Sequence, residues 1–164
     1  MANFYLMCGV PGAGKSTWIK EHVKPGTAVI SRDAIRFSLL RPGDPYFSKE
    51  NTVLHYLWDQ INGALSDGRD VICDQTSLTR KSRKFILSHI TGYDTCSVIW
   101  IATSLEDALA HNELREGTIA YVPPTKIKEM FWLFEEPSYK EGFDYIYKWN
   151  SYENVMKMKK KEEG

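Results

Sequence analysis

The sequence has few cysteines, and they do not point to a disulfide framework or a metal site. Cys8, Cys73 and Cys96 are the three present, and each lies inside or beside an expected strand. An odd number of cysteines on buried strands is typical of small reduced side chains in a cytosolic protein. The four histidines show no metal-ligand spacing either. The expected location of the protein is therefore the cytoplasm.

A long apolar run and an excess of charge are also lacking. No apolar stretch approaches the ~18 residues of a membrane span, and no basic-then-apolar signal segment is seen, so no membrane contact is expected. Lysine plus arginine and aspartate plus glutamate number 21 each. Proteins that grip a long duplex usually carry a basic excess. Any contact with nucleic acid should therefore be short and local, and no protein partner is evident.

The order of apolar segments predicts an α/β fold. The 164 residues are expected to form a single domain, residues 1–164, because no repeat or linker divides them. Strand-like runs alternate with helical patterns, which is typical of parallel β-α units. The expected strands are residues 4–8, 27–30, 70–73, 96–102 and 143–147.

Helices are predicted from apolar spacing and from capping residues. Residues 50–66 carry apolar side chains at spacings of three and four, and the helix over residues 80–90 is expected to bury Phe85, Ile86 and Ile90. Further helices are expected from Leu105 to about Arg115 and from Pro123 to just before Pro137, with a charged, solvated tail over residues 157–164.

Residues 9–16, GVPGAGKS, match the phosphate-binding pattern G-x-x-x-x-G-K-[ST] between an expected strand and an expected helix. The N–H groups of such a loop and the helix dipole attract a phosphate chain. Lys15 would reach the terminal phosphates, and the Ser16 hydroxyl would bind Mg²⁺. A chance glycine-rich turn is the alternative. The sequence therefore predicts binding of ATP or another nucleoside triphosphate. The expected contacts are Gly9, Pro11, Gly12, Ala13, Gly14, Lys15, Ser16, Thr17 and Arg115.

Asp33 and Arg36 follow the second expected strand, whose carboxyl end should face the ligand crevice of a parallel sheet. A carboxylate there suits an alcohol acceptor, because a hydroxyl must lose a proton as it attacks phosphorus. Arg36 would share a helix face with Asp33 and could hold an anionic acceptor. The alternative is that Asp33 caps the helix and Arg36 forms a surface ion pair.

Asp74, Arg115 and a basic cluster complete the candidate set. Asp74 ends the third expected strand, where it would contribute to the Mg²⁺ shell through water, orient an arginine, or simply cap a helix. Arg115 could neutralise charge during phosphoryl transfer, although a cation at a helix end also complements the dipole. The basic side chains of residues 80–84 fit either a substrate phosphate or a solvated helix face.

Four separated segments together resemble the kinase domain of bacteriophage-type 5′-polynucleotide kinases. They are residues 9–18, Ser31–Arg36, Asp74–Leu78 and Arg115–Pro123, and the similarity spans roughly residues 3–135. The implied fold has three layers, with a mostly parallel five-stranded sheet, helices on both faces and a small lid at about residues 111–123. If a phage carries the gene, the location would be the host cytoplasm.

The resemblance implies a role for each matching residue. Lys15 and Ser16 would bind the triphosphate and Mg²⁺, and Asp33 would act as general base for a 5′-hydroxyl. The implied acceptor contacts are Arg36, Asp74 and Thr76, and Arg115 would bind the donor phosphates from the lid.

Two departures from the family pattern bear on the acceptor. Ser77 stands where relatives commonly have asparagine, and the lid has few cations, with His111 where an arginine is expected. Three functions follow as hypotheses. The first is an ATP-dependent kinase of a DNA or RNA 5′-hydroxyl end, active in nucleic-acid repair. The second is a kinase of a small alcohol such as a sugar, nucleoside or drug. The third is a nucleotide-binding ATPase or switch module, which Asp33 and Arg36 disfavour.

Overall fold

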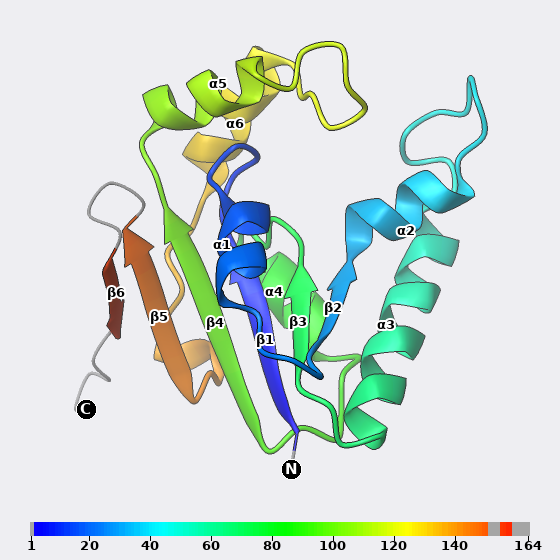
Figure 1. The fold of residues 1–164 in the computed structure, drawn as a ribbon, viewed down its shortest axis with the longest axis vertical. Coiled ribbons are helices and arrows are strands. Elements are labelled where there is room, and N and C mark those ends of the chain that lie inside the picture. Colours follow the sequence, from blue (N-terminus) through cyan, green and yellow to red (C-terminus); the bar gives the residue numbers. More distant parts are fainter. Residues whose placement is uncertain (1, 151–154, 159–164) are drawn as a thin grey trace.

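The structure is a computed structural model that describes residues 2–150 and 155–158 (Figure 1). Within these residues the strands are β1 (Asn3–Cys8), β2 (Ala28–Ser31), β3 (Val71–Asp74), β4 (Thr95–Ala102), β5 (Tyr145–Asn150) and β6 (Val155–Met158). The helices are α1 (Lys15–His22), α2 (Arg32–Leu39), α3 (Glu50–Ser66), α4 (Arg80–Leu87), α5 (Leu105–Glu113) and α6 (Pro124–Leu133), with a short 3₁₀ helix, η1 (Tyr139–Glu141). The predicted alternation of strands and helices is confirmed.

The strands form one sheet in the order β2-β3-β1-β4-β5-β6. Strands β1 to β5 are parallel, and β6 pairs antiparallel with β5. The sheet therefore has one strand more than the five that the sequence predicts. Lys157 and Met158 belong to β6, so the charged tail expected from residue 157 does not begin there, and residues 159–164 lie outside the described part of the chain.

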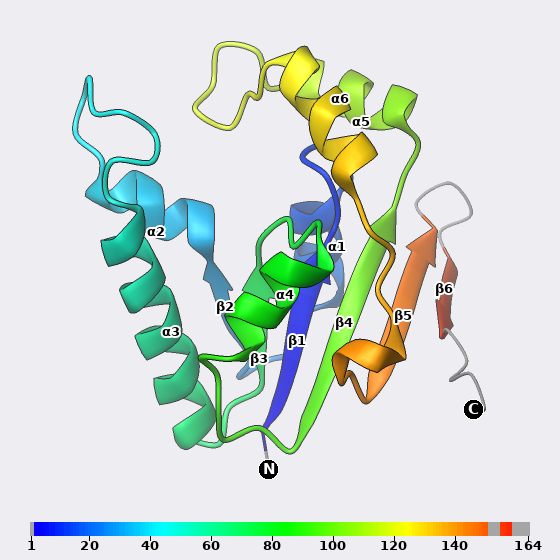
Figure 2. The same cartoon turned by 180° about the vertical axis from the view of Figure 1, so that it is seen from behind.

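Helices cover both faces of the sheet because the buried strands carry apolar side chains on both sides. Along β1, Phe4 and Leu6 pack in a cluster with Leu57 of α3, whereas Met7 packs in a second cluster with Ile19 of α1. Figures 1 and 2 show α1 on one face of the sheet and α4 on the other, with α3 beside the β2 edge. The predicted three-layer α/β arrangement is confirmed.

The helix predicted over residues 50–66 is observed with the same bounds, and its apolar stripe is buried apart from the half-buried Trp58. The helix expected over residues 80–90 is shorter. Ile86 and Ile90 are buried as expected, but Phe85 is 47% exposed, so its predicted burial is wrong. Arg83 takes the position on the buried face that lies one turn before Ile86.

Helices α5 and α6 lie beyond the carboxyl ends of the central strands, and the loop between them faces the loop between α2 and α3 (Figures 1 and 2). The segment from α5 to α6 contains residues 111–123, for which the sequence predicts a lid. In the described part of the chain, no helix combines the length and the apolar character that crossing a membrane requires.

Candidate active site

The loop between β1 and α1 depends on glycine at two positions. Gly12 and Gly14 have φ angles of 83° and 104°, in the left-handed region. A Cβ at Gly12 would lie 2.4 Å from the carbonyl oxygen of Ala108 on α5, whereas a Cβ at Gly14 would meet nothing within 4 Å. Ala13 is buried and Pro11 half-buried, so this loop offers a ligand mainly its backbone.

The Lys15 ammonium lies against this loop. Its Nζ donates to the carbonyl oxygens of Gly9 at 2.8 Å and Val10 at 3.0 Å. Burial lowers the pKa of Lys15, and the charge of Asp74 opposes that effect. A half-buried cation whose hydrogen bonds go to neutral carbonyl groups is well suited to exchange those bonds for bonds to a phosphate oxygen.

The first turn of α1 fits an anionic ligand. Ser16 and Thr17 are exposed, and the turn contains no acidic side chain, so the positive end of the helix dipole is not neutralised locally. Within residues 2–150 and 155–158, no group of three His, Cys, Asp or Glu side chains forms a metal cage. Mg²⁺ is commonly held by one or two protein ligands together with substrate phosphates. The Ser16 hydroxyl and the Asp74 carboxylate are oxygen donors of the type that Mg²⁺ prefers.

Two carboxylates lie at the carboxyl edge of the sheet beside Lys15. Asp74 ends β3, and its neighbour in the sheet register is Ser31, the residue that caps α2 two positions before Asp33. Burial raises the pKa of Asp74. The Lys15 charge opposes this rise, Asp33 adds to it, and Arg115 opposes it. Four residues that the sequence singles out are therefore close enough to interact electrostatically. Ser31, not Asp33, is the cap of α2.

Arg36 is not a surface residue. It is 4% exposed, its Nη1 pairs with Asp33 Oδ1, and its Nε and Nη2 donate to the two oxygens of Glu50 at 3.1 and 2.8 Å. The alternative of a surface ion pair is therefore wrong. The guanidinium also has most of its hydrogen-bonding capacity in use within the protein, because Nη1 donates in addition to the hydroxyl of Tyr46 at 2.8 Å.

Sequence reasoning missed Glu50 and Tyr46. Glu50 accepts from both Arg36 and Arg32, with Oε1 2.5 Å from Arg32 Nη2. Burial acts to raise the pKa of Glu50, but the hydrogen bonds from Arg36 and Arg32 outweigh it and the pKa lies below its ordinary value. Tyr46 donates to Asp33 Oδ1 at 2.9 Å, and burial followed by the Asp33 charge raises the Tyr46 pKa to about 12. No motif links these residues, because the loop between α2 and α3 brings them together.

The segment after β3 is tied directly to the phosphate-binding loop. The N–H of Gly9 donates to the carbonyl oxygen of Thr76 at 2.9 Å. Thr76 therefore contacts the loop through its backbone, and its side chain is half-buried. Ser77 has a φ of 48°, the left-handed region that a non-glycine residue seldom adopts. Its carbonyl oxygen accepts from Cys8 Sγ at 3.2 Å, and burial raises the pKa of that thiol to about 11.

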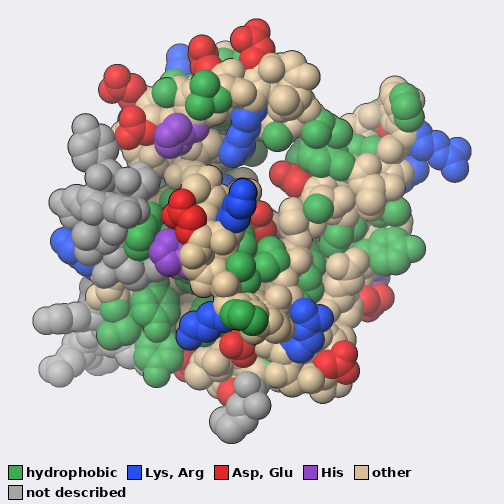
Figure 3. Space-filling model, in the orientation of Figure 1, with side chains coloured by type: hydrophobic (Ala, Val, Ile, Leu, Met, Phe, Trp, Pro, Cys, Tyr) green, Lys and Arg blue, Asp and Glu red, His purple; other side chains and the backbone are tan. Residues whose placement is uncertain are grey.

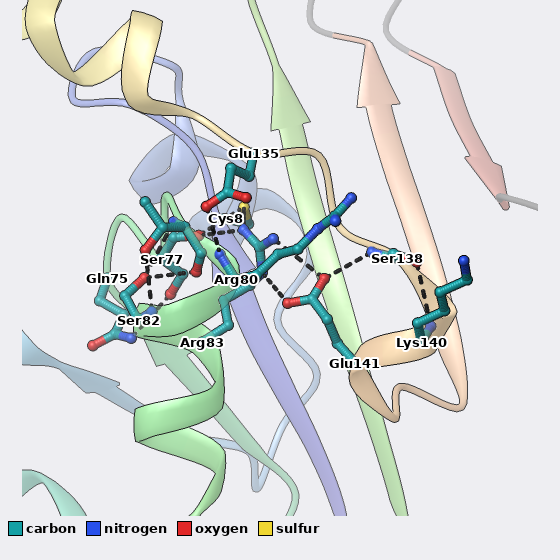
Figure 4. Close-up of polar contacts among 11 residues, drawn as sticks. Cys8, Gln75, Ser77, Arg80, Ser82, Arg83, Glu135, Ser138, Lys140 and Glu141 are labelled. Carbon is teal, nitrogen blue, oxygen red and sulfur yellow. Dashed lines mark hydrogen bonds and ion pairs between the residues drawn. The ribbon is translucent and has the colours of Figure 1, made fainter.

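Arg83 binds this segment through its guanidinium (Figure 4). Its side chain is fully buried. Nη1 donates to Ser77 O at 2.8 Å, while Nε and Nη2 donate to the two oxygens of Glu141 at 2.8 and 3.2 Å. The basic cluster over residues 80–84 therefore divides: Arg80, Lys81 and Lys84 are exposed, but Arg83 is not part of a solvated face. The spacing of Arg83 with Ile86 and Ile90 is the signal that could have revealed its burial.

Arg115 lies just past the end of α5, where it lines a cavity of about 440 Å³ together with Gly12, Gly14 and Thr17. Helix α5 also contacts the glycine loop directly, because His111 Nδ1 lies 2.8 Å from Gly12 O and must carry the proton that this carbonyl accepts. The cavity thus lies between the segment predicted to be a lid and the phosphate-binding loop.

One residue of the cavity wall has a buried donor atom without a partner. Trp18 is 9% exposed and lines the cavity, and its Nε1 has no hydrogen-bond partner among the described residues. A buried donor without an acceptor is costly unless a ligand or water completes it. Thr17, Glu21 and Arg115 also line the cavity, and their side chains offer polar groups to a ligand.

Solved structures share this fold. One chain of the Pnkp1/Rnl/Hen1 RNA repair complex aligns with a TM-score of 0.70 and 20% identity, over 99% of this chain and 50% of that chain. The protein thus spans half the length of that relative. Kti12 of Chaetomium thermophilum, in complex with ADP-AlF3, aligns with a TM-score of 0.64 and 15% identity over 90% and 89% of the two chains. A gluconokinase from Sinorhizobium meliloti 1021 aligns with a TM-score of 0.56 and 18% identity over 82% and 76%.

These similarities establish a shared phosphate-loop kinase-like fold. The sequence itself matches a family model described as an AAA domain over residues 4–137, a span that contains the glycine loop, both carboxylates and Arg115. Since the match covers most of the chain, the protein belongs to the AAA domain family.

Proposed function

We propose that the protein is an ATP-dependent kinase that transfers the γ-phosphate to the 5′-hydroxyl of a polynucleotide end. The observation that carries this proposal is the placement of Lys15 at the start of α1 and Asp74 at the carboxyl end of β3, where the charges of Asp33 and Arg115 act on the pKa of both. A nucleotide-binding switch needs the phosphate loop, but it does not need a carboxylate such as Asp33 to accept a proton from an acceptor hydroxyl. The match of these four residues to the phage-type polynucleotide kinase pattern supports the polynucleotide acceptor.

In the proposed reaction the acceptor oxygen forms a bond to the γ-phosphorus, the bond from that phosphorus to the β,γ-bridging oxygen breaks, and the hydroxyl proton moves to Asp33. Tyr46 and Arg36 both bind Oδ1 of Asp33, which leaves Oδ2 to receive this proton. Lys15 and Arg115 neutralise charge that develops on the transferred group and the leaving diphosphate. Mg²⁺, when bound through Ser16 with Asp74 nearby, supplies further neutralisation of the phosphates.

The Arg36 geometry bears on how an acceptor anion would bind. Four hydrogen bonds of the guanidinium go to Glu50, Asp33 and Tyr46. One N–H of Nη2 remains for the acceptor's phosphate. We therefore propose that Arg36 both orients Asp33 and contacts this phosphate weakly, beside Thr76.

The same observation favours a small alcohol as the second candidate acceptor. The charge of Arg36 is already balanced inside the protein, and the whole chain has no net charge, so little cationic surface is left for a polyanion. A sugar or a nucleoside needs none. The fold shared with a gluconokinase is compatible with this alternative.

An acceptor panel separates the two. Wild-type protein and the Lys15→Ala variant are incubated with γ-labelled ATP, Mg²⁺ and either 5′-hydroxyl oligonucleotides, nucleoside 3′-monophosphates, nucleosides, or sugars such as gluconate. We expect label on the 5′ oxygen of the first two classes and none with Lys15→Ala. Higher kcat/KM on nucleosides or sugars than on every 3′-phosphorylated acceptor would replace the polynucleotide by a small alcohol. Transfer by Lys15→Ala within threefold of wild type would place the phosphate site elsewhere.

A further inference from the structure

Two aromatic side chains stand out in the loop between α2 and α3. Tyr46 is 45% exposed and Phe47 is 66% exposed. Their ring centres lie 4.6 Å apart and their planes form an angle of 85°. This edge-to-face contact with Tyr46 stabilises the orientation of the Phe47 ring. Large apolar side chains that are this exposed and adjacent often mark a binding surface.

The pair lies beside the carboxylate proposed as general base. The Tyr46 hydroxyl donates to Asp33 Oδ1 at 2.9 Å, and the Arg36 Cζ atom lies 4.4 Å from the Tyr46 ring centre and 5.6 Å from the Phe47 ring centre. The polar end of Tyr46 is thus committed to Asp33. The Phe47 side chain has no polar atom and makes no such hydrogen bond. Its exposed ring therefore remains open to a ligand beside the Arg36–Asp33 pair.

The surroundings of Phe47 suit a flat ligand with polar edges. Phe47 lines a hollow of about 170 Å³ together with Ser48, Lys49, Glu50, Asn51 and Thr52. The Ser48, Asn51 and Thr52 side chains offer hydroxyl and amide groups, and Lys49 and Glu50 carry opposite charges. Figure 3 shows hydrophobic side chains gathered beside the opening that separates this side of the molecule from the α5 and α6 side. Across that opening the facing loop exposes Leu114 and Ile119, at 86% and 72%.

We infer that Phe47, backed by Tyr46, is the stacking surface for the nucleobase of the nucleotide whose 5′-hydroxyl is presented to Asp33. The inference rests on the proposed function and names the part of the acceptor that is recognised. In a nucleotide the base lies one sugar ring from the 5′ oxygen, and Phe47 lies beside the Tyr46 side chain that binds Asp33. Stacking on an aromatic ring needs no net charge and tolerates every base. A neutral protein with a compensated arginine could therefore still select a nucleic-acid end.

The test compares two acceptors that differ only in the base. One is a deoxynucleoside 3′-monophosphate, and the other is the same sugar 3-phosphate without a base, 1,2-dideoxyribose 3-phosphate. The ratio of kcat/KM between them is measured for wild type, Phe47→Ala, Phe47→Trp and Tyr56→Ala. Tyr56 is a matched control because it is an exposed aromatic residue of α3, at 49%, outside the loop.

We expect wild type to favour the base-bearing acceptor by about tenfold or more, because stacking one base on an aromatic ring has roughly that value. The ratio should fall close to one in Phe47→Ala, be retained in Phe47→Trp, and stay at the wild-type value in Tyr56→Ala. Because the ratio is taken within each variant, a partial loss of folded protein cancels.

Three results overturn the inference, and they are distinguishable from one another. A wild-type ratio near one, or a ratio that Phe47→Ala leaves unchanged, removes the stacking surface while 5′ transfer still stands. The absence of transfer to both acceptors, with transfer to sugars in the panel above, removes the proposed function and the inference together. A fall in the ratio with Tyr56→Ala equal to that with Phe47→Ala would also contradict a specific role for Phe47.

Discussion

Among the described residues, both hydrogen bonds to the Asp33 carboxylate go to Oδ1, from Tyr46 and from Arg36. If Asp33 is the general base, Asp33→Asn should lower kcat by roughly 100-fold or more while the acceptor KM changes far less. Tyr46→Phe keeps the ring and removes only the hydroxyl. It should lower kcat by about tenfold, because a hydrogen bond to a charged group is worth about 1.5–3 kcal/mol, and leave KM near wild type.

Steady-state kinetics with a 5′-hydroxyl oligonucleotide at saturating ATP measure both parameters. Tyr56→Phe is the control, since it removes an exposed hydroxyl elsewhere on α3. If Asp33→Asn and Tyr46→Phe mainly raise KM and leave kcat intact, the two residues bind the acceptor. That result would contradict the proposal that Asp33 is the general base and that Tyr46 orients it.

Glu50 gives the stability of the protein a definite pH dependence. Burial would raise its pKa, but hydrogen bonds from Arg36 and Arg32 bring the pKa below its ordinary value of 4.5. A lowered folded-state pKa stabilises the fold fully above 4.5, and that contribution disappears as the pH falls from 4.5 through the lowered pKa. Glu50→Gln should therefore cost about 1.5–3 kcal/mol at neutral pH, and the difference from wild type should shrink in acid.

Urea unfolding followed by tryptophan fluorescence, at pH 7 and at several values below 4.5, measures this difference. The Glu129→Gln variant is a suitable control, because Glu129 is 64% exposed in a surface pair with Lys126 and should change stability little. A difference between wild type and Glu50→Gln that stays constant or grows on acidification would show that the ion pairs of Glu50 do not stabilise the fold.

Helix α4, η1 and the segment after β3 are joined by Arg83 and Glu141 (Figure 4). Arg83→Met leaves a nearly buried carboxylate and the Ser77 carbonyl without their donor, so it should destabilise the protein by about 3–5 kcal/mol. Chemical denaturation measures the loss. Lys84→Met, an exposed neighbour on the same helix, should cost no more than ~0.5 kcal/mol.

Replacing both partners provides a stricter comparison. Arg83→Met combined with Glu141→Met should be more stable than Arg83→Met alone, because no unpaired buried charge then remains. If Arg83→Met costs no more than Lys84→Met, or if the double variant is the less stable of the two, the ion pair does not hold these elements together.

The elements with a strong local pattern could be predicted from the sequence. The residues that define the glycine loop between β1 and α1 are consecutive in the sequence. The apolar residues of α3 recur at spacings of three and four along a helix of seventeen residues. The strand β6 has only four residues and contains neither a motif nor a long repeating pattern. Its Val155–Met158 segment is stabilised by pairing with β5, which no local pattern reveals. The shift of β5 from residues 143–147 to Tyr145–Asn150 has the same cause, because its bounds follow its pairing with β4.

The candidate site divides in the same way. Four candidate residues lie at the ends of strands or helices that the β-α topology places at one edge of the sheet: Lys15, Asp33, Asp74 and Arg115. Their location at the same edge could therefore be predicted from the sequence. The neutralisation of Arg36 by Glu50 could not, because these residues are fourteen positions apart across an irregular loop. The burial of Arg83 was obscured by its basic neighbours, although its spacing with Ile86 is that of a core position.

The molecule as a whole has no net charge, so it should make few contacts with the additional phosphates of a long acceptor. If the protein is a 5′ kinase, kcat/KM should rise little, within about threefold, from a nucleoside 3′-monophosphate to a 20-nucleotide acceptor. The logarithm of the acceptor's kcat/KM should also fall with the logarithm of salt concentration with a slope near −1, about one phosphate contact.

Measurements between 50 and 300 mM salt, on acceptors of one, two, five and 20 nucleotides, check both expectations. Neutral osmolyte at matched osmolality serves as the control for effects of water activity. A slope of about −4 or steeper, or a steady gain in kcat/KM with length, would indicate an extended cationic track that the charge balance does not suggest.

The position of β1 at the centre of the sheet has a consequence for how the protein is made. Phe4 pairs with Val71 on one side and with Cys96 on the other, so the strand that leads into the glycine loop finds its neighbours late in synthesis. Contacts this distant in sequence slow folding. A nascent chain that stops before β4 would contain the complete glycine loop sequence, yet it would lack the strand that β1 needs on one side. The ability to hold a nucleotide should therefore arise abruptly on the ribosome, once β4 has emerged, and not gradually as the loop is translated.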